Sequence, residues 1–258
     1  MLGNPPNPRH EFRVRRLLRP RYKYIFIYAT VLVVVVAAVL SSAAVVLKPF
    51  QIKNMETEKI QNLLAAVNIE ASFDDAENMY KEYFKEELAI NKAGEVVSRY
   101  DVANAKLEGD VRPFAIDVKK HQALLKSGED VAFPLYVYEK DGEKGYVIPL
   151  QGAGLWGDIW GNIALASDFN TIVGVNFDHA SETPGLGAEI ATKAFQAPFA
   201  GKHIYDANGN FTSVPVKKNA TDNEVDAISG GTITSTAVSD MLYNDLNFYQ
   251  NYRNKIVE

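Results

Sequence analysis

The stretch LYVYEKDGEKGYVI, residues 135–148, indicates the fold of this 258-residue chain. Its two ends, Leu135–Tyr138 and Gly145–Ile148, are short runs rich in aromatic and β-branched residues, which is typical of strands. Between them lies Asp141-Gly142, a dipeptide that strongly favours a tight turn between antiparallel strands. The stretch is therefore predicted to form a β-hairpin.

The residues around this hairpin predict further strands and several helices. Strands are predicted at Ile159–Leu165 and Ile172–Phe177, with a weaker one at Phe211–Val216. The spacing of apolar residues predicts helices at Met55–Val67, from Asp74 or Asp75 to Ile90, at Gly185–Phe195, and along the C-terminal stripe of Val238, Met241, Leu242, Leu246 and Tyr249. Residues 91–130 show weak periodicity and receive no assignment. Strands joined by hairpins between flanking helices predict an α+β fold with a mostly antiparallel sheet flanked by helices.

The N-terminal part of the chain has a different character. The net charge of −5 is uneven: residues 1–23 hold seven basic side chains and one acid (+6), leaving −11 on the remaining 235 residues. Residues 24–47 contain no charged side chain. As a helix, 24 residues would extend roughly 36 Å, enough to cross a hydrocarbon core of about 30 Å. A single N-terminal transmembrane helix is therefore predicted at residues 24–47.

A cleaved signal peptide is the alternative for this apolar stretch, because Ser41–Ala44 are small residues near a possible cleavage point. The stretch is longer than a usual signal sequence and continues through Val45–Leu47, which favours an uncleaved anchor. Because the basic residues precede the span, the positive-inside rule places residues 1–23 in the cytoplasm and residues 48–258 outside it. The span also accounts for the basic N-terminus, so no nucleic-acid partner is expected.

Composition excludes several kinds of site. The chain has no cysteine, which excludes disulfides, thiolate catalysis, iron–sulfur clusters and cysteine-bound zinc. The four histidines, His10, His121, His179 and His203, show no spacing typical of metal ligands, so no metal is expected. The chain also lacks a Gly-x-Gly-x-x-Gly motif in a βαβ unit, so it is not expected to bind NADH itself.

Three glycine-containing segments are the candidate functional residues. They are GAGLWG at residues 152–157, HASETPGLGAEI at residues 179–190 and DAISGGTITS at residues 226–235. Each has a structural interpretation. By itself the first segment favours a strand corner with a core tryptophan, Trp156. In the second, His179 continues the alternation of the preceding strand. In the third, Thr234 or Ser235 is a candidate helix N-cap.

The third segment also has a functional interpretation. Backbone N–H groups at the start of a helix, after two glycines, are suited to binding a phosphate. The segment is not a P-loop, because the lysine and the full spacing are absent.

Together these segments resemble the FMN-binding domain family of membrane electron-transfer flavoproteins, over roughly residues 145–245. The run SGGTITS at residues 229–235 resembles that family's Ser-Gly-Ala-Thr flavinylation motif, and ETPGLG at residues 182–187 is similar to its second signature. The predicted single span and exported body are similar to those of the C-subunit family of the Na+-translocating NADH:quinone reductases (Nqr).

The resemblance implies a covalent cofactor. In that family a separate flavin transferase joins FMN from FAD to a threonine by a phosphoester bond, with release of AMP. The threonine of the motif corresponds to Thr232, with Thr234 as the alternative acceptor. Gly231 stands where the family commonly has Ala, a small change that scarcely alters this assignment.

The residues expected to bind the flavin besides Thr232 come from all three segments. They are Ser229, Gly230, Gly231 and Thr234 near the phosphate, Trp156 and Leu186 over the ring system, and Glu182 and Thr183 at its polar edge.

The resemblance further implies a component of an inner-membrane complex that couples NADH oxidation and quinone reduction to Na+ export. The partners would be the other membrane subunits, and the chain itself would carry electrons on its flavin. The expected divisions are residues 1–23 (cytoplasmic), 24–47 (transmembrane), 48–144 (the N-terminal part of the periplasmic domain) and 145–258 (the FMN-binding domain).

Other functions remain open at this point. The G-type component of Rnf complexes, which exchange electrons between ferredoxin and NAD, shares the motifs. A membrane-anchored flavin-binding module without turnover and a non-flavinylated interaction domain are further alternatives.

Overall fold

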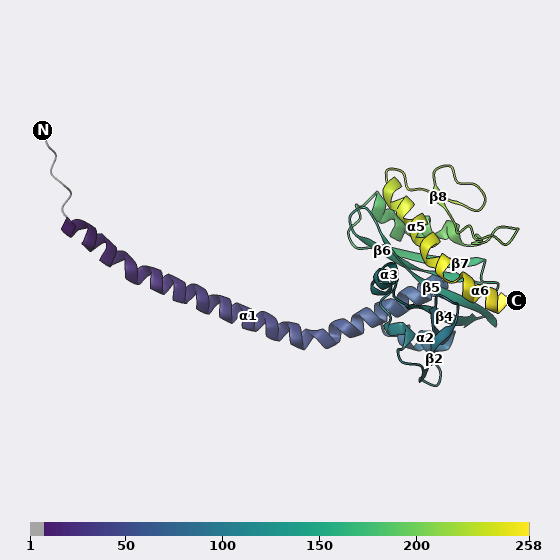
Figure 1. Cartoon of the computed structure of the whole chain (residues 1–258), viewed down its shortest axis with the longest axis horizontal. Helices are drawn as coiled ribbons and strands as arrows, with labels where there is room; N and C mark the ends of the chain where they lie inside the picture. The colour runs from purple at the N-terminus through teal and green to yellow at the C-terminus, as the bar shows by residue number, and fades with distance from the viewer. Residues whose placement is uncertain (1–7, 258) are drawn as a thin grey trace. The chain divides into compact units, whose positions relative to one another are not determined.

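The structure is a computed structural model that describes residues 8–257 (Figure 1). Residues 1–7, the first part of the predicted cytoplasmic N-terminus, lie outside the described residues. The chain divides into two compact units, Met1–Glu56 and Thr57–Glu258, and each is described by itself.

The first unit is formed by the N-terminal part of helix α1 (Pro8–Ala66), drawn in purple to blue in Figure 1. Every side chain from Tyr22 to Glu56 is exposed, including the whole predicted span of residues 24–47. By length and composition, this helix is apolar enough to cross a membrane. The predicted helix at Met55–Val67 is present, but it is the end of α1 rather than a separate element, because the helix continues through Pro49.

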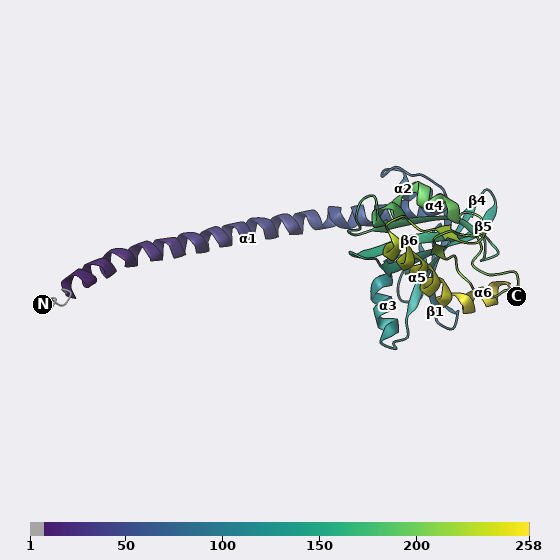
Figure 2. The same ribbon diagram turned by 90° about the horizontal axis from the view of Figure 1, so that it is seen from above.

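The second unit is built on one antiparallel sheet, which is seen edge-on in Figure 2. Within residues 8–257 the sheet has seven strands in the order β3-β2-β1-β4-β5-β6-β7. Their bounds are β1 Phe84–Asn91, β2 Val96–Asp101, β3 Lys106–Glu108, β4 Ala132–Lys140, β5 Glu143–Ala153, β6 Asp158–Leu165 and β7 Ile172–His179. Together with the helices this confirms the predicted α+β class.

The hairpin predicted at residues 135–148 is formed by β4 and β5. Lys140 pairs with Glu143, and the turn residues Asp141 and Gly142 both have positive φ, 55° and 81°. Two consecutive positive φ values define the turn that matches the twist of antiparallel strands. The strands predicted at Ile159–Leu165 and Ile172–Phe177 are likewise confirmed as β6 and β7.

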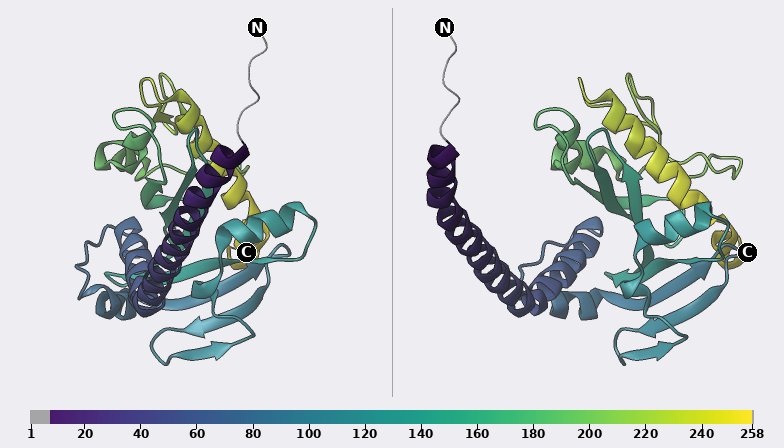
Figure 3. Two further views of the ribbon diagram at one scale, coloured as in Figure 1. Left: turned by 90° about the vertical axis from the view of Figure 1, so that its left-hand side faces the viewer. Right: turned by 60° about the vertical axis from the view of Figure 1, so that its left-hand side comes forward.

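Helices and short turns surround the sheet. They are α2 Ala76–Tyr83, η1 Pro113–Ala115, α3 Val118–Lys126, η2 Gly187–Ala191, α4 Lys193–Gln196, η3 Ala197–Phe199, α5 Thr232–Phe248 and α6 Gln250–Val257. Figure 3 shows α5, in yellow, lying along the sheet. The unassigned residues 91–130 therefore supply β2, β3, η1 and α3.

The helix predicted from Asp74 or Asp75 to Ile90 is wrong in its second half. Helix α2 ends at Tyr83, and residues 84–91 form the central strand β1, which pairs with β2 on one side and β4 on the other. Leu88, Ala89 and Ile90 are all buried. Burial on both faces of a central strand removes the alternation that identifies a strand in a sequence.

Two other predictions are also corrected. The helix predicted at Gly185–Phe195 is divided into η2 and α4, because Thr192 is extended (ψ 145°) and caps the second piece. The strand predicted at Phe211–Val216 is reduced to β8 (Val216–Lys217), which pairs in parallel with β9 (Val225–Asp226). Ser213, with φ of 57°, interrupts the extended backbone before it.

Side chains of the sheet alternate between two hydrophobic cores, one on each face. The core on the α5 face includes Leu135, Val137, Ile148, Ile163, Met241 and Leu242. The core on the other face includes Leu63, Leu64, Tyr80, Tyr136, Val147 and Ala164. The predicted C-terminal stripe is confirmed, because all five of its residues are buried in the first core.

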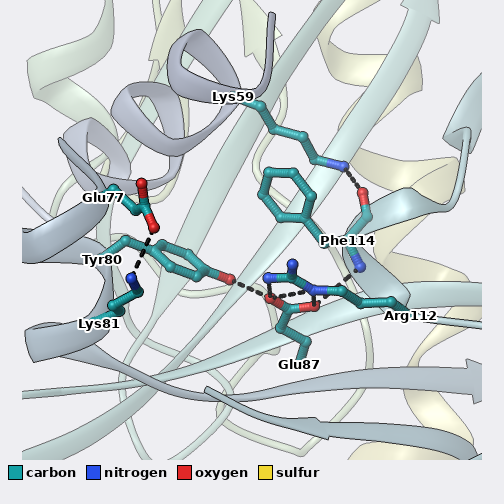
Figure 4. Close-up of polar contacts among 7 residues, drawn as sticks. All are labelled: Lys59, Glu77, Tyr80, Lys81, Glu87, Arg112 and Phe114. Carbon is teal, nitrogen blue, oxygen red and sulfur yellow. Dashed lines mark hydrogen bonds and ion pairs between the residues drawn. The ribbon is translucent and has the colours of Figure 1, made fainter. Parts of the chain in front are cut away.

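A buried carboxylate, Glu87 on β1, organises the second face (Figure 4). Arg112 donates to both of its oxygens, at 2.9 and 2.5 Å, and the Tyr80 hydroxyl donates at 3.0 Å. The backbone N–H of Phe114 donates to the same carboxylate at 3.2 Å, while Lys59 donates to the Phe114 carbonyl at 2.6 Å. This network joins the end of α1 to the sheet.

Candidate functional site

The three glycine-containing segments meet at the carboxylate of Glu182, whose residue is only 5% exposed. Its Oε1 accepts a hydrogen bond of 2.8 Å from the backbone N–H of Trp156. Its Oε2 accepts one of 2.7 Å from the hydroxyl of Thr234. One side chain thus joins the segments at residues 152–157 and 226–235.

Two glycines make room for this carboxylate. A Cβ on Gly154 would lie 2.5 Å from Glu182 Oε1, and a Cβ on Gly187 would collide with Oε2 and with the Thr234 hydroxyl. Distances this short are not tolerated between non-bonded atoms, so any side chain at these positions would force the segments apart. Gly154 and Gly187 are therefore explained by close packing around Glu182.

The segment at residues 152–157 forms a tight turn after β5. The N–H of Gly154 donates to the carbonyl of Gly157 at 2.8 Å, and the Ser181 hydroxyl donates to the Trp156 carbonyl at 2.7 Å. The backbone of Trp156 is therefore fixed on both sides, while its side chain is 66% exposed. The interpretation of Trp156 as a core residue is wrong.

The second segment follows β7 and leads into η2. His179 is the last residue of β7 and accepts a hydrogen bond of 3.2 Å from the Glu182 N–H through Nδ1. Thr183 is exposed, and Leu186 is 40% exposed. Leu186 lies against Gly230, where a Cβ would be 2.7 Å from Leu186 Cδ2. Gly230 also has φ of +76°, a conformation that favours glycine.

Helix α5 begins at Thr232, with Gly231 as its N-cap and no side chain of the described residues capping it. The prediction of Thr234 or Ser235 as N-cap is therefore wrong. Both lie inside the first turn and are buried: the Ser235 hydroxyl accepts from the Ile228 N–H at 3.0 Å, and Thr234 bonds Glu182. Ser229 and Thr232 are exposed.

Large apolar side chains are exposed on each segment of the site. Leu155 is 48% exposed and Ile233 is 59% exposed, in addition to Trp156 and Leu186. All four belong to segments that Glu182 brings together, and apolar surface gathered in one place commonly marks a site that binds a ligand or a partner. We call Leu155, Trp156, Leu186 and Ile233 the apolar rim.

A cleft of about 960 Å³ begins at Thr232 and extends along α5. Its walls are α3 and α5, and β5 forms its floor. Lys119 of α3 forms a 2.5 Å ion pair with Asp158 of β6, and both line the cleft. Thr232 is therefore one of the residues that line the cleft.

The far end of the cleft holds a carboxyl group that sequence reasoning missed. Burial raises the pKa of Asp245 from its usual 3.8 to about 7, although hydrogen bonds from the Gln151 N–H (2.7 Å) and the Gln122 side chain (2.5 Å) oppose the rise. No sequence signal identifies Asp245, because it lies among the polar positions between the apolar residues of the stripe.

Comparison with known proteins agrees with these features. Residues 154–247 match the model of the FMN-binding domain family. This range contains most of the first glycine-containing segment and all of the other two. The C subunit of the Na(+)-translocating NADH-quinone reductase of Pseudomonas aeruginosa is 31% identical over 83% of this chain and 89% of its own length. The corresponding protein of Haemophilus ducreyi is 30% identical over 78% and 80% of the two chains.

Solved structures show the same relationship. The crystal structure of the Na(+)-translocating NADH-quinone reductase C subunit from Parabacteroides distasonis has a TM-score of 0.69 and 41% identity, and the match covers 80% of this chain and 96% of that one. A structure of Shewanella oneidensis NqrC shares the fold, with a TM-score of 0.61 and 23% identity over 79% and 98% of the chains. The chain therefore belongs to the C-subunit family of the Na(+)-translocating NADH-quinone reductase and contains the FMN-binding domain of that family.

Proposed function

We propose that this chain is an electron carrier whose FMN is joined covalently, through its phosphate, to the hydroxyl of Thr232. The observation that carries the proposal is the position of this hydroxyl: it is exposed, at the first residue of a helix whose N-terminus has no side-chain cap among the described residues.

The neighbouring hydroxyls are less suited to be the acceptor. Thr234 and Ser235 are 2% and 1% exposed and are occupied by Glu182 and the Ile228 N–H. Thr236 is exposed but donates to the Thr232 carbonyl at 3.0 Å. Attachment at Thr234 would also place a phosphate beside the Glu182 carboxylate, where like charges repel. Thr232 is therefore favoured over the alternative Thr234.

The start of α5 fits the charge of the product. A phosphodiester keeps one negative charge, and the first N–H groups of a helix together with its dipole stabilise an anion. The residues that directly precede the N-terminus of α5 are Ser229, Gly230 and Gly231. Because Gly230 has no Cβ, Leu186 can lie against it. These residues would hold the phosphate.

The exposed apolar rim is suited to cover the flavin ring. Trp156 offers a flat apolar face and Leu186 an aliphatic one, and Thr183, three residues before Leu186, is exposed. Glu182, expected at the polar edge of the ring, is turned toward Trp156 and Thr234. When bound, FMN supplies the electron-carrying chemistry, and the protein's residues hold it and shield one side of it.

The attachment needs a second protein. A flavin transferase would join the Thr232 oxygen to the FMN phosphorus of FAD while the bond between the two phosphates breaks and AMP leaves with the hydroxyl proton. The exposure of Thr232 on the folded domain suits an acceptor that another protein must reach.

The proposal extends to topology and partners. Residues 1–23 would lie in the cytoplasm, residues 24–47 would cross the inner membrane once, and residues 48–144 and 145–258 would form the periplasmic domain that carries the flavin. The partners would be the other membrane subunits of a complex that oxidises NADH, reduces quinone and exports Na+. The relatives named above favour this complex over the Rnf alternative.

In-gel flavin fluorescence tests the proposal. The full chain is produced together with a flavin transferase, denatured and separated on a gel. The wild-type band should fluoresce and the band of Thr232→Val should not, whereas Thr236→Val, which removes another exposed hydroxyl of the same helix, should keep its fluorescence. A fluorescent band from Thr232→Val would overturn the assignment.

A further inference from the structure

We infer that Glu182 is a positioning residue that fixes the separation between Trp156, which covers the flavin, and the first turn of α5, which carries the tether. The inference rests on the proposed function and assigns Glu182 a role other than contact with the ring.

The hydrogen bonds of Glu182 are divided between two segments. Oε1 accepts from the Trp156 N–H and Oε2 accepts from the Thr234 hydroxyl, so each oxygen serves a different part of the site. A carboxylate accepts hydrogen bonds at both oxygens and donates none, which suits it to join two donors. Thr234 is two residues beyond Thr232 in the same helical turn, so its position determines that of the tether.

The surroundings give this carboxylate little freedom. The residue is 5% exposed, and Gly154 and Gly187 leave no space for a Cβ beside its two oxygens. Among the described residues no ion pair includes Glu182. Its carboxylate is held by two uncharged donors, the Trp156 N–H and the Thr234 hydroxyl, and its own N–H donates to His179. Removing a donor from a buried carboxylate leaves it unsatisfied, and the local structure must then rearrange.

The turn that carries Trp156 depends on the same carboxylate. Its backbone N–H is bound by Glu182 and its carbonyl by Ser181, while the indole itself is exposed. The position of the indole is thus determined through the backbone rather than by packing of the ring. Loss of the Glu182 contact would allow the indole to move relative to Thr232.

Two measurements on Thr234→Val, which replaces the hydroxyl by a methyl group of similar size, test this inference. The first is amide hydrogen exchange at the Trp156 N–H in the full chain made without a flavin transferase. Protection of this amide should be lost in Thr234→Val and retained in Thr236→Val, whose hydroxyl lies on the same helix but bonds the Thr232 carbonyl.

The second measurement is the fluorescence of the flavin attached to the full chain, because an indole in contact with a flavin quenches it. Emission per bound flavin should rise in Thr234→Val toward that of Trp156→Phe. Glu182→Gln leaves one acceptor oxygen for two donors, so it should change both readouts in the same direction as Thr234→Val. It serves as the second variant if Thr234→Val does not fold.

Unchanged Trp156 protection in both variants would overturn the inference whether or not flavin is attached. Lost protection of the Trp156 amide with unchanged flavin emission would also overturn the inference, because the hydrogen bonds of Glu182 would then not determine how the Trp156 indole lies against the flavin. Failure of the proposed function looks different. No flavin would then be found on the wild-type chain, while amide exchange at Trp156 would still report whether Glu182 links Trp156 to Thr234.

Discussion

The hydroxyl of Thr234 donates a hydrogen bond of 2.7 Å to the buried carboxylate of Glu182, 52 residues earlier in the chain. The bond joins the first turn of α5 to the loop after β7, and both are part of the candidate flavin site. Its contribution to stability is separable from any role in cofactor binding.

Replacing Thr234 by Val should therefore destabilise the protein by about 1–3 kcal/mol, the typical cost of leaving a buried polar group without its partner. Thr236→Val, on the exposed side of the same helix, should change the free energy of unfolding by less than about 0.5 kcal/mol. Urea unfolding of the two variants measures the difference. Equal free energies of unfolding for the two variants would show that the hydrogen bond from Thr234 to Glu182 does not stabilise the protein.

The two adjacent glycines before α5 should respond differently to alanine. Gly230→Ala places a Cβ 2.7 Å from Leu186 at a φ of +76°, so it should cost at least ~1–2 kcal/mol and displace Leu186. Gly231→Ala meets Ile228 at 3.0 Å with a negative φ of −104°, so a cost below about 1 kcal/mol and retained flavin attachment are expected. Unfolding curves and in-gel flavin fluorescence of both variants test this. Loss of flavin in Gly231→Ala alone would contradict it.

Asp245 should make stability depend on pH. Its pKa rises from 3.8 to about 7 on folding, so between these values the folded protein binds more protons than the unfolded one. The free energy of unfolding should then fall as pH rises from about 4 to about 7, by up to about 1.4 kcal/mol per pH unit, and level off above.

The comparison of Asp245→Asn with the wild type across this pH range isolates that effect. The amide does not titrate, so the downward slope should shrink in Asp245→Asn. A slope unchanged by Asp245→Asn would mean that the carboxyl is not responsible.

The Glu87–Arg112 pair should be important for the stability of the sheet. Glu87 is fully buried, so Arg112→Ala leaves a buried charge without its cation, and a loss of about 3 kcal/mol is expected even though Arg112 is partly exposed. Arg99, whose 3.6 Å pair with the neighbouring Glu86 is exposed, provides the matched control: Arg99→Ala should cost less than about 1 kcal/mol. Thermal unfolding that does not distinguish the two variants would contradict this assignment.

Local chemistry in the sequence was sufficient for several elements. Asp141-Gly142 predicted its hairpin because the turn type requires positive φ, and the spacing of Val238, Met241 and Leu242 predicted the buried face of α5. The motifs around Ser229–Thr232 and Glu182–Gly187 located the segments that converge in the fold.

Elements that depend on distant partners could not be predicted in this way. Strand β1 contains the helix-favouring run Lys85–Glu87, and only its place between β2 and β4 makes it extended. The roles of Glu182 and Asp245 arise from burial against residues far away in sequence. For the same reason the segment at residues 152–157, taken by itself, favoured a core position for Trp156, although this side chain is exposed: its environment depends on the turn fixed by Ser181 and Glu182.

The most direct test of the account is a fragment mass spectrum of the full chain made together with its flavin transferase. Trypsin should release residues 219–253 as one peptide, because it contains no internal Lys or Arg, and this peptide holds Ser229, Thr232, Thr234, Ser235 and Thr236. The account predicts one added FMN, less one water, with fragment ions that assign it to Thr232. An unmodified peptide, or an FMN assigned to Thr234 or any other residue, would contradict it.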